Sequence, residues 1–312
     1  ADKDIVDDIR NRISSIDVDS INASGELSQY IENYPYSIFP QVYETQRPDI
    51  VQSNLVEGKI AILIDGDPFV ITVPILFTDF FQAATDYYQR TVLSNFNRLI
   101  RIISIFIVIA LPSAYLTLLT YNPELIPIKF VITIVQARKD IALSPFMEIL
   151  SIQIVIEILR EGGLRLPSKI AQTLSIVGGF IIGSAALQSN LVSAATLVVV
   201  GVATIGTFVV PNYDMAASIR LLGFPILFLT NYMGALGLLA GYYVLFVHLL
   251  SLDSFGVPYF PIDKFSDFKD MYIRSPLWKM NKRPESIPNT NPIRQTDFRN
   301  KFGGTKDEKS RK

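Results

Sequence analysis

Hydrophobic positions gather in the middle of the chain, whereas both ends mix charged and apolar residues as soluble proteins do. Ile170–Gln188 and Leu191–Val210 carry no charged residue, and Ile102–Tyr121 is a third long apolar run. A hydrocarbon core about 30 Å thick requires about 20 mostly apolar residues in a helix, and these runs meet that length. The pattern therefore predicts an α-helical polytopic membrane domain over residues 97–253.

Two less regular stretches decide how often the chain is expected to cross the membrane. Leu221–Leu250 is long enough for one long span or a tight helical hairpin, and Ile128–Ala137 is too short to cross. Ser144–Leu159 is apolar apart from Glu148 and Glu157, a pattern that fits a buried, interfacial or re-entrant helix. We expect four to six crossings.

Residues 1–96 read as a small α/β domain that precedes the membrane domain. Lys59–Ile64 and Phe69–Val73 are apolar or alternating, and the turn residues Asp65-Gly66-Asp67-Pro68 between them predict a β-hairpin. Tyr34–Asp49 is rich in Pro and Tyr and is expected to form a loop. Helices are predicted at Asp7–Ile16, Leu27–Asn33 and Ile50–Glu57.

Basic residues set the expected orientation in the membrane. A helix predicted from Thr78 runs into the first span, with Arg90, Arg98 and Arg101 just before that span. Basic residues in this position favour the cytoplasmic side, so the N-terminal domain should be cytoplasmic. Residues 254–312 are rich in basic residues, Pro and Asn, which predicts a cytoplasmic tail, mostly disordered after about residue 280.

Composition narrows the function. The 312 residues are 49% hydrophobic and carry a net charge of −1, which gives no reason to expect nucleic-acid binding. The chain has no cysteine and one histidine, His248, so disulfides, thiol nucleophiles and nearly all zinc or iron–sulfur sites are excluded. P-loop, G-x-S-x-G, H-E-x-x-H and Rossmann motifs are absent from the sequence. We therefore expect neither an enzyme nor a cofactor.

Glu148 and Glu157 are candidate intramembrane carboxylates. Nine positions at 100° per residue place them on opposite faces of one helix, so they do not form an acid–base pair. Carboxylates inside a membrane are costly, which favours either a role in ion passage or ion pairs with Arg160 and Arg165. The residues alone leave both alternatives open.

A stripe of small or weakly polar residues follows one face of the helix Ile170–Gln188. Small residues at spacings of three and four allow close helix packing, and a G-xxx-G pair is part of the stripe. Alternatively, the stripe lines the lumen of an oligomeric pore, where its polar groups would solvate ions. The candidate pore-lining residues are Gln172, Ser175, Gly179, Gly183 and Ala186.

Several strings in fixed order resemble one protein family. The chain carries them at Asn33–Pro40, Glu57–Gly66, Pro68–Val70, Asp86–Tyr88, Leu111–Tyr115, Glu148–Leu150, Glu157–Pro167, Ser175–Gly179 and Ile182–Ala186. Together they resemble the GerA-type A subunits of bacterial spore germinant receptors, and the resemblance extends to about Pro261. No single string is specific enough, but the combination is.

The resemblance implies a multi-pass subunit of the spore inner membrane that forms a homo-oligomeric ring in contact with membrane lipid. The ring is expected to conduct monovalent cations, with a transporter-like B subunit and a lipoprotein C subunit as partners and both termini cytoplasmic. Family members usually have a longer region ahead of Ala1, so residues 1–96 would be the C-terminal part of their head domain. The implied channel favours pore lining over packing for the stripe.

Other functions stay open at this point. A secondary transporter would bind its substrate midway in the bilayer, and Ser144–Leu159 is the one segment that resembles the discontinuous helix such a site needs. A non-conducting scaffold of the same receptor, or a related spore-membrane channel linked to dipicolinate release, would also carry these strings.

Overall fold

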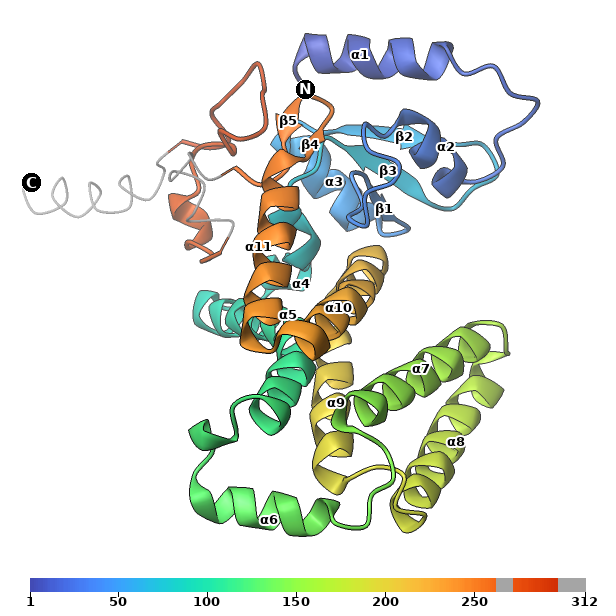
Figure 1. Ribbon diagram of the computed structural model, residues 1–312. Coiled ribbons are helices and arrows are strands. Elements are labelled where there is room, and N and C mark those ends of the chain that lie inside the picture. Colours follow the sequence, from blue (N-terminus) through green and yellow to red (C-terminus); the bar gives the residue numbers. More distant parts are fainter. Residues whose placement is uncertain (262–271, 297–312) are drawn as a thin grey trace, which may run out of the picture. The chain divides into compact units, whose positions relative to one another are not determined.

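The computed structural model describes residues 1–261 and 272–296, apart from the side chains of Lys169, Leu174 and Ser175 (Figure 1). Contacts divide the chain into two compact units. The head unit contains residues 1–102, residues 211–215 and the described residues from Phe246 onward. The membrane unit contains residues 103–210 and 216–245.

A three-stranded antiparallel sheet organises the head unit. Its strands are β1 (Tyr43–Thr45), β2 (Ile60–Leu63) and β3 (Val70–Val73), in the order β1-β3-β2. The predicted hairpin is confirmed as β2 and β3, with Ile62 opposite Ile71. The prediction of a loop over residues 34–49 is wrong at β1. This strand has only three residues, which is too short for an alternating pattern to show in the sequence. Pairing with β3, with Tyr43 opposite Thr72, creates this strand.

Three helices cover this sheet, close to the predicted positions. They are α1 (Lys3–Ser14), α2 (Ser24–Ile31) and α3 (Pro48–Glu57). Pro at the first turn starts α3, and Gly58 ends it with a φ of +99°, a conformation that favours glycine. The core of the head is apolar and draws on both helices and strands. It contains Ile9, Leu27, Ile31, Val42, Ile71, Val73 and Phe255.

The helix predicted to start at Thr78 is interrupted. The segment forms a 3₁₀ turn η1 (Phe77–Phe81), a single-turn helix α4 (Thr85–Tyr88) and then α5 (Thr91–Thr120). Asp79 accepts a hydrogen bond from the backbone N–H of Leu76 and so closes η1. Gln82 and Gln89 both have extended backbones, so η1 ends before Gln82 and α4 ends before Gln89, and α5 begins as a separate helix.

The segment after the last long helix folds as part of the head. A two-stranded ribbon forms from β4 (Asp253–Ser254) and β5 (Val257–Pro258), and η3 (Leu277–Lys279) follows. Tyr259 is fully buried, and Ile287 packs with Leu76 and Val257 in a second small core. The described structure thus continues past residue 280 to residue 296, and residues 297–312 of the predicted tail lie outside the described residues, so a mostly disordered tail stays a prediction.

The membrane unit is helical. Besides most of α5 it contains η2 (Pro123–Leu125), α6 (Ile128–Arg138), α7 (Pro145–Leu164), α8 (Ser168–Gln188), α9 (Ala194–Thr207) and parts of α10 (Tyr213–Met233) and α11 (Ala235–Ser251). Figure 1 shows α7 and α8 side by side, and α9 packs on α7. Its core unites α5, α7, α9 and α10 through Leu116, Phe146, Ile149, Val200 and Leu227.

Within the part of the chain that the structure describes, three helices are long and apolar enough to cross a membrane, namely α5, the segment Ile170–Gln188 of α8, and α10. The span predicted at Leu191–Val210 is shorter than expected, because α9 has 14 residues. At 1.5 Å per residue it is about 21 Å long, less than the roughly 30 Å of a hydrocarbon core. Four to six crossings therefore stays a prediction.

The stretch Leu221–Leu250, which the sequence allows as one span or as a hairpin, is divided between two helices. Gly234 separates α10 from α11 with a φ of +57°. A Cβ added at Gly237 would lie 2.1 Å from the carbonyl oxygen of Leu229, so glycine lets the start of α11 approach the end of α10. The chain therefore turns back here as a helical hairpin would.

Candidate functional site

The stripe of α8 is largely uncovered by the other residues that the structure describes. A Cβ added at Gly179 would meet no described atom within 4 Å, and one at Gly183 would only touch Leu197 at 3.9 Å. Gln172 is exposed and Ala186 is half-buried, while the Ser175 side chain lies outside the described residues. Close packing against the described residues thus does not account for Gly179. The stripe is available to a second subunit, to lipid or to a lumen.

Glu148 is fully buried in a polar cluster that joins three helices of the membrane unit. Its Oε1 lies 2.5 Å from Nη2 of Arg138, at the end of α6. Its Oε2 accepts hydrogen bonds of 2.9 Å from the backbone N–H of Ser193 and from the hydroxyl of Thr196. These groups form the first turn of α9, where the helix dipole also stabilises a negative charge.

Glu157 belongs to a separate cluster, in agreement with the expected opposite faces. Its Oε1 lies 3.2 Å from Nη1 of Arg160 and 3.2 Å from Nε of Arg220 on α10. Gln153 and Thr207 line a cavity of about 30 Å³ beside these charges. That volume is enough for a water molecule.

The two clusters have the geometry of structural ion pairs. Each carboxylate is neutralised by an arginine, so a passing cation would have to displace that arginine. Arg160 was foreseen as a partner of Glu157, but Arg165 pairs with Glu161 at 2.6 Å on the exposed side of α7. Arg138 and Arg220 were missed because they come from other helices. A part for Glu148 and Glu157 in ion passage stays a prediction.

Asp86 organises a third charged cluster, in the head unit. Its fully buried carboxylate accepts hydrogen bonds of 2.6 Å and 2.8 Å from Arg101 and one of 3.3 Å from Arg98. Arg274 donates to the backbone carbonyls of Asp86 at 2.6 Å and Gln89 at 2.8 Å. Burial by itself raises the pKa of Asp86, but the hydrogen bonds and charge of Arg101 outweigh it and lower that pKa.

This cluster changes the interpretation of the basic residues before the first span. Arg98 and Arg101 were expected to mark the cytoplasmic side of a membrane, yet both are buried against Asp86. Arg90 is exposed. The sequence signal is ambiguous, because an arginine before an apolar helix can either mark the cytoplasmic side of a membrane or pair with a buried carboxylate. The cytoplasmic orientation of the head stays a prediction.

Metal binding finds no support in the part of the chain that the structure describes. Within residues 1–261 and 272–296, no group of three His, Cys, Asp or Glu side chains gathers closely enough to hold an ion.

Comparison with known proteins gives a consistent result. The model of the family described as Bacillus/Clostridium GerA spore germination protein matches residues 1–286. Three relatives from Bacillus subtilis (strain 168) are spore germination protein KA, 40% identical over 94% of this chain, the uncharacterized membrane protein YfkQ, 40% identical over 91%, and spore germination protein A1, 38% identical over 93%. The chain spans 55%, 56% and 60% of their lengths, respectively. No solved structure matches the chain.

Proposed function

Because the chain belongs to the GerA family of spore germination proteins, we propose that it is a membrane subunit of a spore germinant receptor whose oligomer conducts ions. The chain covers little more than half of its relatives, so the activity of the whole protein is part of this proposal. Release of monovalent cations through the oligomer would be the event that starts germination.

The uncovered stripe of α8 is the observation that carries the proposal. An apolar helix long enough to cross a membrane normally directs its small residues toward a neighbouring helix. A Cβ added at Gly179 would have no described atom of another segment within 4 Å. If α8 helices from several copies surround one axis, Gln172, Ser175 and Gly179 would face the lumen, and polar groups there would solvate ions.

The proposal includes partners and a location. Two of the relatives, KA and A1, are named as spore germination proteins, and YfkQ is named as a membrane protein. We place the chain in the spore inner membrane with both termini cytoplasmic, beside a transporter-like B subunit and a lipoprotein C subunit. No enzymatic step and no cofactor is part of this function.

Potassium flux from liposomes tests the channel. Leu at Gly179 would fill a lumen bounded by α8, so Gly179→Leu should abolish the flux while the size of the oligomer stays unchanged. Gly201→Leu is the matched control, because Gly201 lies on α9 and a Cβ there would also lie more than 4 Å from the described atoms of other segments. This control should conduct like the wild type.

Two outcomes would contradict the proposal. Intact wild-type oligomers without flux would show that the chain does not conduct on its own and would favour a scaffold. Unchanged flux in Gly179→Leu would show that this face of α8 does not line the pore.

A further inference from the structure

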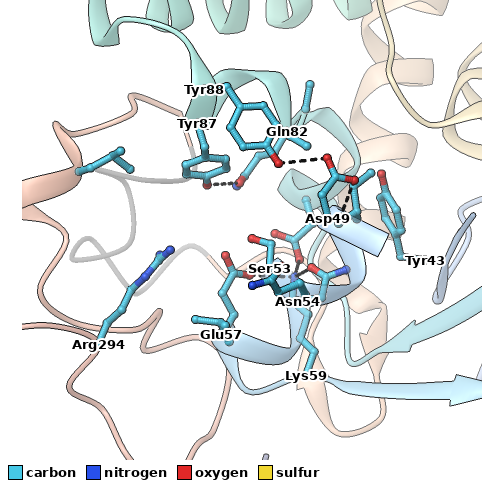
Figure 2. Close-up of a pocket in the computed structure, with 17 residues that line it drawn as sticks. Tyr43, Asp49, Ser53, Asn54, Glu57, Lys59, Gln82, Tyr87, Tyr88 and Arg294 are labelled. Atoms are coloured by element: carbon cyan, nitrogen blue, oxygen red, sulfur yellow. Dashed lines mark hydrogen bonds and ion pairs between the residues drawn. The ribbon is translucent and has the colours of Figure 1, made fainter. Parts of the chain in front are cut away.

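The head unit contains a cavity of about 460 Å³, within the size range of small-molecule sites. Three parts of the chain line it: α3, the segment from η1 to α4, and the segment that follows the last long helix. Figure 2 shows Asp49 and Glu57 from α3, Gln82 and Tyr88 from the second segment, and Arg294 from the third around the open space.

The acidic residues of the cavity already have basic partners. Nζ of the buried Lys59 lies 2.8 Å from Asp79 and 3.2 Å from Glu57. Burial lowers the pKa of Lys59, but the charges of Asp79 and Glu57 outweigh it and raise that pKa, so the lysine stays charged. Asp49 lies 2.7 Å from Arg47, whose hydrogen bonds lower the pKa of Asp49 to about 2. These carboxylates therefore do not call for a cationic ligand.

Arg294 is different, because its guanidinium has no hydrogen-bond or ion-pair partner among the described residues. Its backbone is held in place, since its N–H donates a 2.8 Å hydrogen bond to the carbonyl of Asn281. Arg283 fastens the same segment to α3 through a 2.6 Å hydrogen bond to the carbonyl of Val56. A fixed backbone and a positive charge that has no partner among residues 1–261 and 272–296 favour an anion at this cavity, and arginine suits carboxylates in particular.

The other residues that line the cavity suit a ligand that carries hydroxyl groups in addition to its negative charge. Tyr88 donates a 3.1 Å hydrogen bond to Asp49, and Tyr87 donates a 2.9 Å hydrogen bond to Oε1 of Gln82, which leaves the amide N–H groups of Gln82 as donors. Ser53 adds a hydroxyl to the lining. The tyrosine rings supply apolar faces between these polar groups.

We propose that this cavity binds a small hydroxy acid, with its carboxylate on Arg294 and its hydroxyl groups on Gln82 and Ser53. The ligand joins α3 to the segment after the last long helix, so binding stabilises the docked position of that segment. This inference concerns the head unit alone and does not depend on ion conduction by the oligomer.

Binding measured by calorimetry on the whole chain in detergent tests the site, with gluconate, glucuronate and malate as probes. At least one of the three should bind saturably, and more tightly than glucose or inorganic phosphate. Arg294→Gln should raise its Kd by about tenfold or more, since one charge-assisted hydrogen bond is lost. Lys282→Gln, which removes an exposed charge from the same segment, should leave the Kd unchanged.

Three outcomes would overturn the proposal. They are no saturable binding of any of the three acids, phosphate binding as tightly as the acids, or equal affinities in the wild type and Arg294→Gln. Equal thermal unfolding midpoints of the wild type and Arg294→Gln would exclude misfolding as the cause of a lost affinity. Arg294→Lys, which retains the charge, should recover part of the affinity.

Discussion

At the scale of the residue, buried carboxylates hold distant parts of the chain together. Asp86 forms ion pairs with Arg98 and Arg101, and Glu148 connects Arg138 to the first turn of α9. A buried charge is tolerated only when it is paired and hydrogen-bonded, so each acidic residue determines where its arginines lie. Removal of one partner then leaves the other as an uncompensated buried charge.

Asp86→Asn should destabilise the head unit by about 3 kcal/mol, because Arg98 and Arg101 lose their counter-charge while buried. The lowered pKa gives a second signature. Asp86 stabilises the fold above the usual carboxyl pKa of about 3.9, and this contribution disappears as the pH falls through the lowered pKa. Denaturant unfolding at pH 7 and near pH 3 measures both effects, and the difference between wild type and variant should shrink in acid.

Asp65→Asn is the control for this prediction, because Asp65 is exposed in the turn between β2 and β3. It should change the stability by no more than about 0.5 kcal/mol. An Asp86→Asn protein as stable as wild type at pH 7 would show that the arginines do not need this carboxylate.

At the scale of the element, glycines distinguish helix faces that are covered from those that are not. A Cβ at Gly206 on α9 would lie 2.9 Å from Cγ2 of Val108 and 3.4 Å from the carbonyl oxygen of Ser104, both on α5. At Gly179 and Gly201 the same atom would have no described atom of another segment within 4 Å. The first glycine therefore serves packing inside the membrane unit, and the other two face away from it.

Gly206→Leu should separate α9 from α5 and lower the stability of the membrane unit by roughly 1–3 kcal/mol, the usual cost of overpacking. Gly201→Leu on the same helix should have little effect. Size-exclusion chromatography after heating in detergent measures the fraction that stays monodisperse. If both variants survive heating equally well, α9 does not pack on α5 at Gly206.

At the scale of the whole molecule, each compact unit is built from segments that are far apart in the sequence. The described residues from Phe246 onward belong to the head unit, together with residues 1–102. Phe255, Val257 and Tyr259 are buried there. The core of the head unit therefore includes residues that follow the long apolar helices in the sequence.

A chain that ends after Leu252 should leave the head core open, because it lacks three buried side chains that each contribute roughly 1.5–3 kcal/mol. Limited proteolysis should then cut within residues 1–102 much faster than in the full chain. A chain that ends after Thr296 retains all described residues and should resist like the full chain. Equal protection of both truncated chains would show that the head folds without its C-terminal segment.

The sequence by itself determined the features that depend on neighbours along the chain. Period and turn chemistry predicted the hairpin of β2 and β3, the helix α3 and the long apolar helix α8, because these patterns act over a few residues. Nine positions along α7 were enough to place Glu148 and Glu157 on opposite faces. The ordered strings identified the family before any contact was known.

Only the tertiary structure decided the features that depend on partners far away in the sequence. Strand β1 exists because β3 pairs with it, and Arg138 and Arg220 are partners of the two glutamates because other helices bring them there. Arg101 meets Asp86 across 15 positions, and Arg294 reaches the cavity of α3 across more than 200. Hydropathy and spacing carry no information about such contacts, because the free energy that fixes them comes from burial and charge pairing in the folded chain.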